Sequence, residues 1–213
     1  MSPVLRNRSR GHAIVAGLAL SLLASCGSTR SQLVNDSPAV NDVWLQPSPI
    51  LQQQLADEAQ RLPWTRGFEH LEQIRWFASV GEPAYETLLR LAEDRRDRVA
   101  AAALAALGAT LDRRLVSHIR MLKWSGERDQ TDLGLERARA LIRLGDWSEI
   151  PLLIRGLRDG RIYTRALCLD ALREATHETH GFDPRSDAGV RKKSIERWES
   201  WWNDRAGDEF LRG

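Results

Sequence analysis

The sequence is poor in the residues and motifs on which several classes of protein depend. Its 213 residues include only two cysteines, Cys26 and Cys168, which cannot build a disulfide-rich scaffold. It also lacks a Gly-rich phosphate loop, a Ser/His/Asp pattern and a haem-type Cys-x-x-Cys-His motif. These absences favour a protein that is not an enzyme and has no cofactor, no metal and no small-molecule substrate.

A strong net charge is also missing once the N-terminus is set aside. Three of the 31 basic residues precede Cys26 and no acidic residue does, so 28 basic and 29 acidic residues remain from Cys26 onward. The formal charge of +2 therefore comes from the N-terminal segment. Because nucleic-acid binding needs a basic surface, we expect no nucleic-acid partner.

The one long apolar run is short for a membrane span. Residues 13–24 form twelve apolar or small residues, whereas a helix that crosses roughly 30 Å of hydrocarbon needs about 20. The length suits the apolar region of an export signal, and the run ends in Leu23-Ala24-Ser25-Cys26. This ending resembles the lipobox of bacterial lipoproteins, in which the signal is removed before the cysteine and the cysteine is acylated. An ordinary secretory signal cut after a small residue is the alternative.

The resemblance implies a lipoprotein signal peptide over residues 1–25 and a lipid attached to Cys26. Two or three acyl chains anchor a protein firmly, whereas one chain holds it marginally. Gly27 follows the cysteine, and similarity to sorted lipoproteins then favours export to the outer membrane of a two-membrane bacterium, facing the periplasm. Residues 26–48 are rich in Ser, Asn, Asp and Pro and are predicted to form a flexible tether that reaches about 25 Å.

A repeated helical pattern follows this segment. Four segments carry apolar residues at three-residue steps, which predicts one apolar stripe on each of four helices. Three of them end in glycine, a residue favoured just after a helix, and residues 82–91 and 148–157 predict shorter second helices with a proline near the start. Residues 124–130 predict a longer loop. The four segments are Ile74-Phe77-Val80, Ala101-Leu104-Leu107, Ala138-Leu141-Leu144 and Ala166-Leu169-Leu172.

Residues 144–172, LGDWSEIPLLIRGLRDGRIYTRALCLDAL, resemble the short HEAT repeats of the phycobilin-lyase type. The resemblance implies an all-α, armadillo-like fold, namely a short right-handed α-solenoid of HEAT-type helix pairs. Residues 49–65 would then form an N-terminal capping helix, residues 66–176 the repeats, and residues 177–213 a Trp-rich C-terminal cap. An ordinary helical bundle is the alternative.

In that family an Asp turn precedes an Arg that opens the next helix. Arg137 and Arg165 occupy the Arg position and Asp159 the turn position, whereas Gln73 and Ala100 replace the Arg elsewhere. An Asp–Arg ladder between repeats is therefore partial at best. Arginines on the long helices are expected to be solvated; if one edge presents them to an anionic partner, the candidate contact residues are Arg98, Arg137 and Arg165.

Both ends of a solenoid need a cap that covers the stacking face. Residues 188–204 predict a helix with Ile195, Trp198 and Trp202 on one side and Trp201 beside them, similar to a Trp-x-x-Trp-Trp tail that follows HEAT repeats in other bacterial proteins. Burial of these indoles is the expected role, and a platform for glycan or peptide is the alternative. At the other end Leu51, Leu55, Leu62 and Trp64 are predicted to form the cap.

Two further groups could suggest chemistry. His177 and His180, with Asp183 nearby, lie at the end of a helix before a turn and match no zinc motif, so we expect solvated turn histidines. Cys168 aligns with Ala103 in the repeat and is expected to be a buried thiol, because a nucleophile needs an adjacent base and a lowered pKa.

The sequence thus predicts a membrane-anchored lipoprotein whose solenoid is a non-catalytic scaffold for a protein or peptide of the cell envelope. The alternative is a structural or glycan-binding envelope lipoprotein that uses the Trp cluster or an arginine face. An enzyme with dispersed catalytic groups is a third possibility that no motif supports.

Overall fold

The computed structural model describes residues 44–124 and 131–207, and every regular element in these ranges is helical. The predicted all-α class is therefore confirmed. The predicted signal peptide, Cys26, most of the tether, residues 125–130 of the predicted loop and the end of the predicted cap lie outside the described residues.

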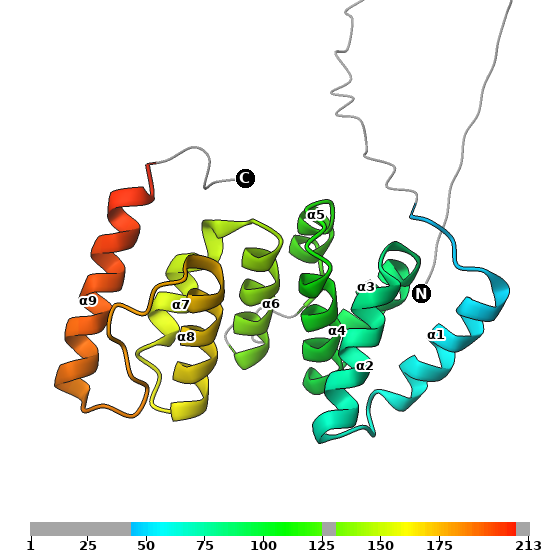
Figure 1. The fold of residues 1–213 in the computed structure, drawn as a ribbon, viewed down its shortest axis with the longest axis horizontal. Helices are drawn as coiled ribbons and strands as arrows, with labels where there is room; N and C mark the ends of the chain where they lie inside the picture. Colours follow the sequence, from blue (N-terminus) through cyan, green and yellow to red (C-terminus); the bar gives the residue numbers. More distant parts are fainter. Residues whose placement is uncertain (1–43, 125–130, 208–213) are drawn as a thin grey trace, which may run out of the picture. The chain divides into compact units, whose positions relative to one another are not determined.

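The helices follow one another in chain order, from cyan to red in Figure 1. A 3₁₀ turn leads into α3 (η1, Glu82–Ala84) and another into α7 (η3, Trp147–Glu149). The α-helices are α1 (Pro49–Arg61), α2 (Gly67–Val80), α3 (Tyr85–Ala92), α4 (Asp97–Ala109), α5 (Leu115–Arg120), α6 (Asp132–Arg143), α7 (Ile150–Gly156), α8 (Ile162–Thr176) and α9 (Ala188–Arg205).

The four repeated stripes form the long helices α2, α4, α6 and α8, as the sequence predicts. One large side chain of each stripe is at most 1% exposed. These are the second stripe residues Phe77, Leu104 and Leu141, and the third stripe residue Leu172. The predicted second helices are α3 and α7, each with its proline near the N-terminal end, where the missing N–H costs nothing.

The repeated glycines do not all end helices. Gly81 and Gly145 follow α2 and α6 with φ of 70° and 90°, a region that glycine enters without strain. Gly108 instead lies inside α4, so its predicted role as a helix end is wrong. A Cβ at Gly108 would lie 3.0 Å from the Ala140 Cα, so its missing side chain lets α4 approach α6 closely.

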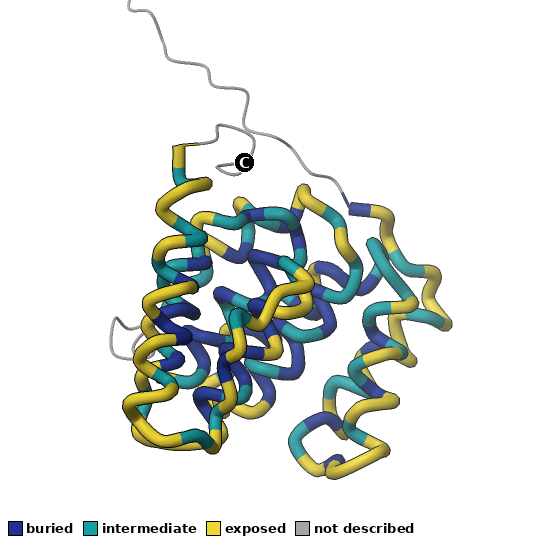
Figure 2. Tube along the Cα trace, turned by 60° about the vertical axis from the view of Figure 1, so that its left-hand side comes forward, coloured by how far each residue is buried: buried dark blue, intermediate teal, exposed yellow. Residues whose placement is uncertain are grey.

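The apolar stripes are covered by neighbouring helices. Helix α4 packs against α2, α3 and α6, α6 packs in turn against α8, and α9 packs against α7. The buried residues form two clusters that meet at α6: Leu133 and Leu141 belong to the first, Leu135 and Ile142 to the second. Figure 2 shows buried positions where helices face one another and a mostly exposed outer side on α9.

The N-terminal end is covered differently from the prediction. Leu55 and Leu62 are each 1% exposed, as expected for a cap, but Trp64 is 77% exposed and the prediction for it is wrong. Trp44, which the prediction placed in the tether, is buried instead. Its ring meets Tyr85 edge-on at 5.1 Å and belongs to the core.

A short Asp-x-Arg turn recurs before the helices. In each copy an aspartate oxygen accepts a hydrogen bond from the backbone N–H two residues later, which fixes the chain direction as the next element starts. In the α8 copy, Arg165 donates to the backbone carbonyls of Asp159 and Gly160 and not to the Asp159 carboxylate. The pairs and their N–O distances are Asp94–Arg96 (2.8 Å), Asp112–Arg114 (3.0 Å), Asp159–Arg161 (2.8 Å) and Asp183–Arg185 (2.9 Å).

The contact between α7 and α8 makes a testable prediction. A Cβ at Gly156 would lie 2.3 Å from the Cys168 Sγ, so Gly156→Ala should lower the free energy of unfolding by about 1–3 kcal/mol through overpacking. Adding Cys168→Ala should recover part of the loss in a double-mutant cycle. Denaturant unfolding measures both effects.

Gly189→Ala is the matched control, because a Cβ there meets nothing within 4 Å. Equal stability of Gly156→Ala and Gly189→Ala would contradict the close contact.

Candidate functional site

A groove runs across the N-terminal halves of α2, α4, α6 and α8, with a volume of about 840 Å³. Its sides come from four helices that are far apart in sequence. The residues that line it are His70, Leu71 and Ile74 of α2; Asp97, Arg98, Ala101, Ala102 and Ala105 of α4; Thr131, Asp132, Leu133, Glu136 and Arg139 at α6; and Arg161, Tyr163 and Leu167 at α8.

The hollow exists because α4 is built largely from alanine. Residues 100–103 and 105–106 of this helix are all Ala, and Ala101, Ala102 and Ala105 face the groove. A methyl group reaches less far than the side chains of the flanking helices, so the surface dips over α4. Alanine also has the highest helix propensity, which keeps α4 helical without large side chains.

The groove exposes apolar groups at two sides. Leu71 is 52% exposed and Tyr163 is 68% exposed, on α2 and α8 respectively. Phe68, one turn before Leu71, is 73% exposed, and Trp64 lies in the preceding turn. Exposed apolar side chains at a hollow, here Leu71 and Tyr163, are typical of an interaction surface.

Several charged residues of the groove take part in ion pairs. Arg161 donates to both carboxylate oxygens of Asp132, at 2.9 and 2.7 Å, and the Thr164 hydroxyl donates to one of them at 3.1 Å. Arg139 pairs with Glu174 at 3.3 Å. The Arg161–Asp132 pair is satisfied within the protein, whereas the Arg139 Nε is buried without a hydrogen-bond partner among the described residues.

Glu136 is different. Its side chain is only 17% exposed, its closest ion-pair contact in the described chain is the Arg139 guanidinium at 3.9 Å, and no hydrogen bond from a described residue reaches its carboxylate. Burial raises the pKa of Glu136, and nearby Asp132 raises it further, while Arg139 lowers it less than burial raises it. The groove therefore contains a carboxyl group whose charged form is poorly compensated.

The three candidate arginines differ in their position and in their contacts. Arg98 lines the groove and donates to the Thr65 carbonyl. Arg137 is not among the lining residues; its guanidinium lies 5.1 Å from the centre of the Trp124 ring. Arg165 is 4% exposed and donates to the Pro184 carbonyl as well as to its own turn, so it holds α8 against the following loop and cannot present its guanidinium to a partner.

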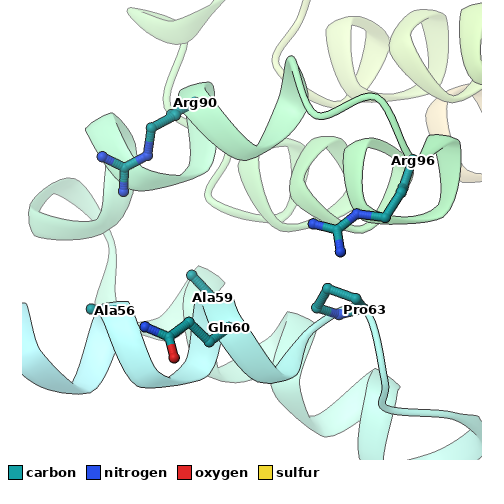
Figure 3. Close-up of a pocket in the computed structure, with 6 residues that line it drawn as sticks. All are labelled: Ala56, Ala59, Gln60, Pro63, Arg90 and Arg96. Atoms are coloured by element: carbon teal, nitrogen blue, oxygen red, sulfur yellow. The ribbon is translucent and has the colours of Figure 1, made fainter.

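A second, smaller hollow lies beside α1. Figure 3 shows Ala56, Ala59 and Gln60 of α1 facing Arg90 and Arg96, with Pro63 below Arg96, around a volume of about 410 Å³. Asp94 holds the Arg96 guanidinium at 2.8 Å. The hollow is half the size of the groove and borders one end of the helix series.

The C-terminal tryptophans pack into one cluster. Trp198 is fully buried, its ring lies 4.3 Å from that of His180 and 5.5 Å from that of Trp201, and Arg205 lies over Trp201 at 4.6 Å. Trp201 and Trp202 are half-buried. The buried Trp198 has no open face on which a sugar or peptide could stack, as expected for a cap.

The candidate chemical groups are also placed. His177 is exposed and His180 is half-buried in the Trp cluster; across residues 44–124 and 131–207, no group of three His, Cys, Asp or Glu side chains could hold a metal ion. Cys168 is fully buried, and burial raises the pKa of its thiol to about 12. The thiol therefore stays protonated at neutral pH and is no nucleophile.

Sequence reasoning missed the groove itself. Glu136 and Tyr163 belong to no motif, and their meeting depends on how four helices align. The alanine run 100–106 was the available signal, because a row of small residues on a central helix leaves a depression.

Comparisons with protein-family models, with curated proteins and with solved structures found no match for this chain. No helix among the described residues has the length and apolarity needed to cross a membrane.

The Trp cluster makes a pH prediction. Burial lowers the pKa of His180 below its ordinary value of 6.5, and Arg197 and Arg205 lower it further against the opposing effect of Glu178. The unfolded chain therefore binds the proton first, so stability is complete above pH 6.5 and falls as the pH drops through the lowered folded pKa. Melting temperatures between pH 7.5 and 5 should show this loss.

His180→Asn, which tolerates the positive φ of 45° at this position, should reduce the loss; His70, whose pKa is also lowered by burial, accounts for part of what remains. His177→Asn is the control, at an exposed position with φ of 60°. An unchanged pH dependence in His180→Asn would contradict the assignment.

Proposed function

We propose that this chain is a lipid-anchored envelope protein whose groove binds a protein or peptide segment without catalysing a reaction. The observation that carries the proposal is the groove of about 840 Å³ over α2, α4, α6 and α8, with exposed Leu71 and Tyr163 at its sides. A peptide-binding site needs such a long hollow with apolar contacts and few polar groups that fix direction.

The proposal includes the finer architecture, a short right-handed α-solenoid of HEAT-type helix pairs. Its support is the packing of each long helix on the next and the division of the core into two clusters at α6. A closed bundle would gather its stripes into one centre, whereas repeats bury their stripes against neighbours and leave an open surface.

Ion pairs between successive helix pairs support the same architecture. Arg114 reaches Glu82 at 3.2 Å, Arg120 reaches the buried Asp146 at 2.6 Å, and Arg158 reaches Glu199 at 2.9 Å. Each joins residues of neighbouring units, as a stacked repeat requires. These pairs differ from the Asp–Arg ladder that the family pattern suggested.

The anchor is part of the proposal and rests on the residues Leu23-Ala24-Ser25-Cys26. An acylated Cys26 would hold the protein at a membrane surface. Because Gly27 follows the cysteine, similarity to sorted lipoproteins favours the outer membrane, with the folded unit in the periplasm. The partner would then be a protein or peptide of the envelope.

Site-specific crosslinking tests the groove in intact cells. A photoreactive residue in place of Leu71 or Ala105, which line the groove, should give discrete protein adducts. The same residue in place of Glu86, exposed on α3 and outside the groove, should not. Ala105→Trp should abolish the Leu71 adducts, because an indole fills the hollow above α4.

Equal adducts from the groove and from position 86, in protein whose circular dichroism and melting temperature are unchanged, would refute a groove-centred function. Loss of folding in Ala105→Trp is detected by the same two measurements, and Ala101→Leu then provides a smaller obstruction.

Metabolic labelling with a fatty-acid analogue tests the anchor separately. The wild type should carry the label and sediment with membranes, whereas Cys26→Ala should carry none, because the thiol is the acceptor. Cys168→Ala is the control, since its buried thiol is inaccessible. Equal label in the wild type and Cys26→Ala would dispose of the lipid anchor.

A further inference from the structure

Glu136 gives the groove a chemical preference. A carboxylate that is 17% exposed and receives no hydrogen bond from a described residue loses its hydration without full compensation. Such a group gains most from a ligand that brings donors and positive charge into the hollow.

The surrounding charges supply only part of that compensation. Arg161 is held by Asp132 and Asp159, at 2.7 and 3.2 Å. Arg139 stands 3.9 Å from Glu136 but is closer to Glu174, at 3.3 Å. Arg98 donates to a backbone carbonyl. Of these three arginines only Arg139 forms an ion pair with Glu136 in the described chain, and its distance leaves room for a further cation from a ligand.

From this geometry we infer that the groove recognises a peptide segment of a partner protein in which a lysine or arginine lies between apolar side chains. The basic group pairs with Glu136 on α6, and the apolar neighbours contact Leu71 on one side and Tyr163 on the other. This inference rests on the proposed function and specifies its ligand.

A free small cation fits the site less well than a peptide. A metal ion needs several oxygen or nitrogen ligands, and the described residues contain no such group. The exposed Leu71 and Tyr163, at 52% and 68%, would also stay uncovered by an ion. A long basic side chain covers apolar surface with its methylene groups and carries its charge at the tip, which matches a carboxylate on an apolar floor.

Burial of Glu136 also makes the pairing selective. Burial disfavours the charged form of its carboxyl, and a cation placed beside it favours that form. A peptide with glutamate or leucine at the same position leaves the carboxyl uncompensated. The difference in affinity between a basic residue and these residues is therefore larger than apolar contacts alone would give.

Selection from a random peptide library on the full-length protein in detergent tests the inference. Wild-type protein should enrich peptides with Lys or Arg between apolar residues, and Glu136→Gln should lose the enrichment for the basic residue while it still binds apolar peptides. Glu86→Gln, an exposed acid on α3, is the matched control and should select the same peptides as the wild type.

The selected peptide then allows a double-mutant cycle. Replacing its basic residue by norleucine should weaken binding by about tenfold or more to the wild type but by much less to Glu136→Gln. Fluorescence anisotropy measures the dissociation constants, and circular dichroism shows that each variant is folded.

The outcomes separate the two levels of the proposal. Selection of apolar peptides without a basic residue would overturn the inference about Glu136. If these peptides compete with each other for the protein and do not bind Ala105→Trp, the groove function still stands. Failure to enrich any peptide that depends on Ala105 and Leu71 would overturn both.

Discussion

The apolar stripes of the long helices α2, α4, α6 and α8 are covered by neighbouring helices. Helix α6 shows the constraint most clearly, because Leu133 and Leu141 lie in one core cluster while Leu135 and Ile142 lie in the other. Two opposite faces of this helix are thus buried against different neighbours. Burial of such side chains is worth about 1.5–3 kcal/mol each, so α6 cannot be stable unless α4 and α8 flank it.

The same constraint produces the open surface. Because the stripes are covered sideways by the next helix, the N-terminal halves of α2, α4, α6 and α8 lie side by side. They bury core residues such as Leu133 and Leu167 and still leave part of their surface open as the groove. Close approach requires small residues: Gly108 lets α4 meet Ala140 of α6, and Gly156 lets α7 meet Cys168 of α8. The alanines of α4 permit close packing on its buried side. On its other side they form the floor of the groove.

The sequence allowed the helices to be predicted because three-residue apolar steps are a local signal. Pro83 in the turn before α3 and Pro151 in the first turn of α7 also mark local starts. It did not reveal which glycine ends a helix: Gly81, Gly108 and Gly145 look alike, and only packing against Ala140 distinguishes Gly108. Trp44 and Trp64 could not be ranked either, because burial depends on Tyr85 and His118, far along the chain. The resemblance to HEAT repeats predicts an aspartate partner for Arg165, yet its partners are carbonyls that no side-chain pattern encodes. The recurring Asp-x-Arg turns were not predicted beyond Asp159, although the pattern stands in the sequence at residues 94–96, 112–114, 159–161 and 183–185.

Glu136 shows why a binding surface resists prediction from sequence more than a core does. Core positions follow from the apolar periodicity of a helix. Glu136 does not interrupt that periodicity, and an acidic residue near the start of a helix is ordinary. What sets it apart is a deficit: Asp132 has Arg161 and Thr164, Glu174 has Arg139 and Arg143, and Glu136 has a single cation at 3.9 Å. A folded chain that satisfies the carboxylates around one position and not that position accepts a local cost in stability. Such a cost is common where a protein must bind something, and here it falls between Leu71 and Tyr163, the two exposed apolar contacts that a ligand spanning the groove would use.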